Sequence, residues 1–98
     1  MELYNPLKGV LNEALERVEN GKGKERHGGA DLPFDKQPMF AIPRELHCDG
    51  APMLFQAVKK IYESRRLPSC QARAELLDAI VYVASCILYE DELVVDEK

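Results

Sequence analysis

The sequence predicts an all-α protein, a small helical bundle of three long helices plus a short helical segment, with a long glycine-rich loop. In residues 6–20, 52–66 and 70–89, apolar side chains recur every three or four positions, which is the spacing of an amphipathic helix. Four of the six glycines fall within residues 21–36, where no apolar periodicity is seen. The 98 residues supply one domain, residues 1–98, with a modest core.

The first predicted helix, residues 6–20, has signals at both ends. Asn5 suits the N-cap position and Pro6 suits the first helical position, whereas Asn20 and Gly21 are residues that end helices. The apolar side chains follow the i, i+3, i+4, i+7 pattern without a fault: Leu7, Val10, Leu11, Ala14, Leu15 and Val18. We therefore expect one amphipathic helix whose other side is rich in glutamate.

Residues 21–36 are predicted to form a loop, which is long for so small a protein, and loops of this length are usually either disordered or functional. Residues 37–46 are predicted to form a short helix or two helical turns. Pro38 and Pro43 can each open a helical turn but prevent one long helix. Phe40 and Ile42 are expected to fold this segment onto the core.

The helices at 52–66 and 70–89 are expected to pack antiparallel, because only a tight link, Leu67-Pro68-Ser69, joins them. Asp49 is a suitable N-cap for the first of the two. The apolar face of that helix consists of Leu54, Ala57, Val58, Ile61 and Tyr62. We expect this helical hairpin to be the core and the helix at 6–20 to cover it.

The helix at 70–89 has one broad apolar face, which we expect other helices to cover: Leu76, Leu77, Ile80, Val81, Val83, Ala84, Ile87 and Leu88. Its other side holds Glu75, Asp78, Tyr82, Ser85 and Tyr89. Because tyrosine rings favour interfaces, we expect this second side to join copies of the chain into a homo-oligomer. Residues 90–98 are acidic and are predicted to fray, since carboxylates are unfavourable at a helix C-terminus.

The composition of the chain excludes several classes of function. The net charge of −4 argues against non-specific nucleic-acid binding, which needs a basic surface. No apolar run reaches the length of a membrane span, and residues 1–20 are too charged for a signal peptide, so we expect a cytoplasmic protein with no membrane partner. The three cysteines, Cys48, Cys70 and Cys86, are widely spaced, which favours reduced thiols and argues against both a disulfide framework and a zinc site.

Basic residues in this acidic chain suggest a site for a phosphate-bearing ligand. Arg26 offers a planar fork of donors that suits phosphate, and His27 and the backbone at Gly28 can add contacts. Gln37 can read a base edge. Further candidates are Lys59, Lys60 and Arg66 for phosphate, and Tyr82 for stacking on a base. The leading hypothesis is a protein that binds a nucleotide-like small molecule without turnover and needs no cofactor.

Two pairs of carboxylates suggest an alternative. Glu75 and Asp78 lie on one helical face, and with Glu13 and Glu16 they could hold Mg²⁺ against a triphosphate. These ExxE and ExxD patterns resemble the all-α nucleoside triphosphate pyrophosphohydrolases of the MazG and dimeric dUTPase type, although a loop and an extra helix separate the pairs here. The resemblance implies Mg²⁺-dependent cleavage to a monophosphate and pyrophosphate. Otherwise Glu13 and Glu16 are simply solvated, and Glu75 and Asp78 form a surface patch or a salt bridge to Arg73 or to the basic helix.

A second resemblance spans residues 25–89. An ERHG segment, an F-x-x-Q-P segment and the helical pair AVKK and ELLDAIVY are similar to small uncharacterised phage proteins. This resemblance implies a role in the host cytoplasm, where small helical oligomers can sequester host signalling nucleotides and so inhibit host defence. A third hypothesis is a protein-interaction module, such as an inhibitor of a host protein, that uses the loop or the tyrosine-rich side.

Overall fold

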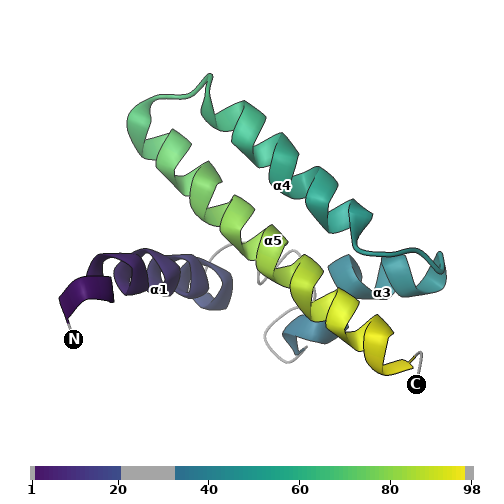
Figure 1. Cartoon of the computed structure of the whole chain (residues 1–98). Coiled ribbons are helices and arrows are strands. Elements are labelled where there is room, and N and C mark those ends of the chain that lie inside the picture. Colours follow the sequence, from purple (N-terminus) through teal and green to yellow (C-terminus); the bar gives the residue numbers. More distant parts are fainter. Residues whose placement is uncertain (1, 21–32, 97–98) are drawn as a thin grey trace.

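The computed structural model describes residues 2–20 and 33–96, and its helices are labelled in Figure 1. In chain order they are a 3-10 turn at Glu2–Tyr4, α1 (Asn5–Asn20), a 3-10 turn at Phe34–Lys36, α3 (Pro38–Glu45), α4 (Ala51–Ser64) and α5 (Ser69–Asp96). These described residues include no strand, so the predicted all-α bundle is confirmed. Most of the predicted glycine-rich loop lies outside them, and its last residues form the second 3-10 turn.

An antiparallel hairpin of α4 and α5 is the centre of the fold, as predicted (Figure 1). Residues 65–68 join the two helices. The second half of α1 packs against the first half of α5, whereas the first half of α1 extends away from the hairpin (Figure 1). Ala14 is the buried residue of α1. None of the described helices is long and apolar enough to cross a membrane.

The hydrophobic core lies where α3, α4 and the second half of α5 meet. Phe40, Met53, Cys86 and Tyr89 form its buried cluster. Phe40 thus lies in the core as predicted, whereas the prediction for Ile42 was wrong, since Ile42 is 56% exposed. The rings of Phe40 and Tyr89 pack edge to face with their centroids 6.5 Å apart. The Tyr89 hydroxyl donates a hydrogen bond of 2.7 Å to the backbone carbonyl oxygen of Cys48, which satisfies both groups inside the protein.

The prediction for the two sides of α5 was wrong. Tyr89, expected on an outer surface, is 1% exposed, and Ser85 is fully buried with its hydroxyl donating to the backbone oxygen of Val81. Much of the expected core face is exposed instead: Leu76, Val83, Ala84, Ile87 and Leu88. The reason is that α5 is apolar on most sides of its middle turns, so periodicity alone could not select the side that meets α4.

The same inversion occurs in α4. Ala57 is buried as predicted, but the other residues of the predicted apolar face are exposed: Leu54, Val58, Ile61 and Tyr62. The side of α4 that meets α5 consists of smaller or polar residues, namely Met53, Ala57, Lys60 and Ser64. The hairpin therefore closes on its less apolar sides and leaves large aliphatic side chains outside.

The acidic C-terminal segment is helical to Asp96 and not frayed from residue 90, because tertiary partners satisfy its carboxylates. Glu92 accepts two hydrogen bonds of 2.7 Å from the guanidinium of Arg44. Glu90 accepts a hydrogen bond of 3.1 Å from the backbone N–H of Gly50, which is the N-cap of α4. The N-cap is thus one residue later than the predicted Asp49, whose carboxylate accepts from the N–H of Ala51.

Candidate functional site

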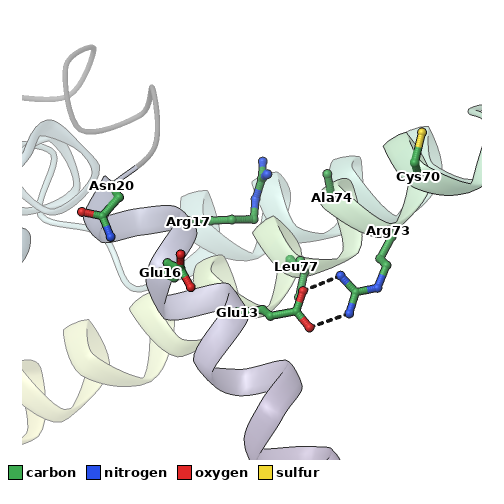
Figure 2. A pocket seen from close by; sticks show the side chains of 8 residues that line it. All are labelled: Glu13, Glu16, Arg17, Asn20, Cys70, Arg73, Ala74 and Leu77. Atoms are coloured by element: carbon green, nitrogen blue, oxygen red, sulfur yellow. Dashed lines mark hydrogen bonds and ion pairs between the residues drawn. The ribbon is translucent and has the colours of Figure 1, made fainter.

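An open cleft of about 470 Å³ lies between the last turns of α1 and the first turns of α5 (Figure 2). Charged and polar side chains from both helices line it: Glu13, Glu16, Arg17 and Asn20 from α1, with Cys70 and Arg73 from α5. The four α1 residues have the spacing i, i+3, i+4, i+7, so they form one polar face of that helix. Ala74 and Leu77 supply the apolar part of the lining.

Glu13 and Arg73 face each other across the cleft (Figure 2). The two guanidinium nitrogens of Arg73 donate to the two carboxylate oxygens of Glu13, at 2.6 and 2.7 Å. These hydrogen bonds lower the pKa of Glu13 and raise the pKa of Arg73. About half of each side chain stays exposed, so water and dissolved anions reach both partners.

Arg17 forms the second ion pair between the helices. Its Nε and Nη2 atoms donate to the carboxylate of Asp78 at 2.8 and 3.2 Å. These hydrogen bonds, followed by the charges of Asp78 and Glu75, raise the pKa of Arg17 against the opposing effect of desolvation. Two arginines from facing helices are thus held at one cleft by carboxylates that solvent can reach.

Three of the four carboxylates of the predicted magnesium site, Glu13, Asp78 and Glu75, each have a cationic partner of their own. Asp78 points towards α1 and Arg17, whereas Glu75 forms an ion pair with Lys60 of α4, with 3.3 Å between Oε2 and Nζ. Glu75 therefore makes a salt bridge to the basic helix, which the sequence suggested as the alternative. Glu16 lines the cleft beside Glu13. Among the described residues, no group of three or more histidine, cysteine or carboxylate side chains could hold a metal ion.

The structure does not gather the predicted phosphate-binding residues into one site. Lys59 and Arg66 are exposed on α4 and on the turn that follows it, and Lys60 is engaged by Glu75. Gln37 is buried at the N-cap of α3, and Tyr82 is half-buried on α5. Arg26, His27 and Gly28 lie outside the described residues.

Sequence reasoning missed Arg17, Asn20 and Cys70 as cleft residues. A signal for Arg17 was present, because Glu13 and Arg17 are four residues apart and share one helical face. For Cys70 there was none, since its place in the cleft depends on how α1 crosses α5.

Comparison with known proteins found no relative of this chain. No model of a protein family matches this chain, and neither the curated proteins nor the solved structures contain a match. The two resemblances drawn from the sequence therefore stay predictions.

Proposed function

We propose that this protein binds a nucleotide or a similar phosphate-bearing ligand without turnover, and that the cleft between α1 and α5 is the binding site. The observation that carries the proposal is the pair of arginines, Arg17 and Arg73, that face one open cleft from two helices. A guanidinium presents parallel N–H donors that match phosphate oxygens as well as they match a carboxylate.

The ion pairs at the cleft are weak enough for a phosphate to replace a carboxylate. Exposed ion pairs contribute little to stability, so a phosphate group could replace a carboxylate on either arginine at small cost. A terminal phosphate group also carries more negative charge than the carboxylate it replaces. The cleft of about 470 Å³ falls within the size range of small-molecule sites.

The sequence after Asn20 holds further candidate donors for a phosphate. Asn20 lines the cleft and Gly21 follows it in sequence. Arg26 is six residues beyond Asn20, and six extended residues span at most roughly 20 Å. The contacts expected from Arg26, His27 and Gly28 stay part of this proposal although these residues lie outside those described, whereas the buried Gln37 does not.

Binding without turnover is favoured over hydrolysis because the candidate catalytic carboxylates are already engaged. Glu13 is held by Arg73, Asp78 by Arg17 and Glu75 by Lys60, so the three carboxylates are directed at different cations and, among the described residues, no three of them converge on one metal position. A small binder of this kind acts by sequestration. If the resemblance to phage proteins holds, its place of action is the cytoplasm of the infected host.

The test is a thermal-shift screen against nucleoside triphosphates, cyclic dinucleotides and cyclic trinucleotides, with and without Mg²⁺, followed by chromatography of each stabilising compound. Recovery of the intact compound supports sequestration. Recovery of a monophosphate and pyrophosphate only with Mg²⁺ would contradict it and favour the pyrophosphohydrolase alternative. Stabilisation by none of the compounds would favour a protein-interaction module.

Two variants separate ligand contact from structural damage, because both break the same ion pair. Arg73→Gln removes a phosphate donor and should weaken binding of the stabilising compound at least tenfold. Glu13→Gln removes the competing carboxylate, frees Arg73 and should tighten binding. Changes in the same direction would mean that the ion pair matters only for the fold.

A further inference from the structure

The large exposed aliphatic residues of the hairpin occupy matching positions on its two helices. On α4, Leu54, Val58 and Ile61 each directly follow a residue of the side that meets α5. On α5, Leu76 and Ile87 each directly follow a residue that faces α4, because Glu75 pairs with Lys60 and Cys86 belongs to the cluster with Met53. Val83 belongs to the same row of α5.

Helix geometry places both rows on the same side of the hairpin. One residue further along an α-helix is a rotation of about 100°. Because α4 and α5 are antiparallel and face each other, the same rotation from their facing sides brings both rows to one surface. The opposite rotation leads to Ala74 and Asp78, which directly precede facing residues and contact α1. The two rows are therefore on the side away from α1, and we name this surface the hairpin face: Leu54, Val58, Ile61, Leu76, Val83 and Ile87.

We propose that the hairpin face binds a second copy of this chain, so that two hairpins form an antiparallel four-helix bundle. Its six side chains are each exposed by between 38% and 58%. Together they leave roughly 500 Å² of aliphatic surface in water, which is close to the largest patch on a typical monomer. With a polar rim, this area approaches the ~800 Å² that each partner contributes to a stable interface.

Charge at the ends of the hairpin face makes it complementary to itself. Arg65 directly follows the buried Ser64 at the turn end, and Glu90 directly follows the buried Tyr89 at the other end. Both Arg65 and Glu90 are exposed. An antiparallel pair of hairpins brings Arg65 of each copy towards Glu90 of the other, whereas a parallel pair would bring like charges together. No charged residue belongs to the six that form the face.

The test is sedimentation equilibrium over a range of protein concentrations. The wild-type protein should have twice the 11.1 kDa mass of one chain. Ile87→Glu, at the most exposed position of the face, should give a monomer that keeps its helical circular dichroism. Phe55→Glu is the matched control, because Phe55 is 65% exposed on α4 but outside the hairpin face, and its mass should stay that of the dimer.

A wild-type monomer at every concentration would overturn the proposal, and so would an Ile87→Glu protein with the wild-type mass. Orientation is tested by charge reversal. Arg65→Glu should raise the dimer dissociation constant several-fold at low salt and less at high salt. Lys59→Glu makes the same charge change on the far side of α4 and should have little effect. Equal effects of the two reversals would overturn the antiparallel arrangement.

Discussion

A substitution at Gly50 tests how closely the N-terminus of α4 packs against α5. A Cβ atom at this position would lie 2.5 Å from Sγ of Cys86 and 2.9 Å from Oε2 of Glu90. The backbone of Gly50 has φ −80° and ψ 8°, which other residues also adopt, so the cost of substitution comes from crowding and not from strain. Gly50→Ala should therefore force the short, buried side chain of Cys86 to move.

The expected loss of stability has two parts. Overpacking of a core position costs roughly 1–3 kcal/mol. Replacing glycine by alanine at an N-cap adds about 1 kcal/mol. The sum is a large fraction of the ~5–15 kcal/mol that holds a domain of this size together.

Gly9→Ala is the matched control. Gly9 lies inside α1 with no atom within 4 Å of the added Cβ, so the same substitution should stabilise the protein by roughly 0.5–1 kcal/mol. Urea unfolding at one fixed protein concentration, followed by circular dichroism, measures both changes. In a double-mutant cycle, Cys86→Ala should restore part of the loss in Gly50→Ala, because it removes the sulfur. A Gly50→Ala protein as stable as the wild type would refute the described packing of α4 on α5.

Three further predictions concern the same end of the bundle, and urea unfolding checks each. Tyr89→Phe should lower the free energy of unfolding by about 1–3 kcal/mol, because the carbonyl oxygen of Cys48 loses its donor inside the protein; no loss would contradict the hydrogen bond. Phe40→Ala should cost about 3–5 kcal/mol, since Phe40 is fully buried, and a loss below 1 kcal/mol would place it outside the core. Arg44 lowers the pKa of Glu92, so this pair stabilises the protein at pH values above the ordinary carboxylate pKa. The gain in stability is lost as the pH falls through the lowered pKa. Glu92→Gln should flatten that part of the plot of stability against pH, and an unchanged plot would contradict the pairing.

Local signals in the sequence were sufficient to predict the helices. Pro6, Pro38 and Pro52 stand in the first turns of α1, α3 and α4, and the short Leu67-Pro68 link correctly predicted an antiparallel hairpin. These signals act within one or two turns of the chain, so no tertiary information was needed to use them.

The orientation of the helices could not be predicted in this way. The side of α5 that faces α4 is selected by contacts such as that of Tyr89 with the backbone of Cys48, which is 41 residues away in sequence. Periodicity identified an apolar side correctly but assigned it to the core of one chain. In the proposed dimer, part of that side, namely Leu76, Val83 and Ile87, is buried between two chains.

Two residues at the contact between α1 and α5 were among the predicted metal ligands, but their partners were not predicted. Glu13 and Asp78 were selected as charged residues on facing helices, and the structure does place them at the contact between α1 and α5. Their partners, Arg73 and Arg17, change the expected chemistry. Among the described residues, the cleft presents two guanidinium groups paired with carboxylates, and no group of three or more potential ligands could hold a metal ion.

The most direct test of the proposed ligand site is an NMR titration that follows the Nε–H signals of the six arginines. The protein is titrated with the compound that stabilises it most in the screen, or with ATP if none does. The signals of Arg17 and Arg73 should shift in proportion to bound ligand, while the signal of Arg44, held by Glu92 outside the cleft, should stay in place. Unchanged Arg17 and Arg73 signals at saturation, or an equal shift of Arg44, would contradict a binding site between α1 and α5.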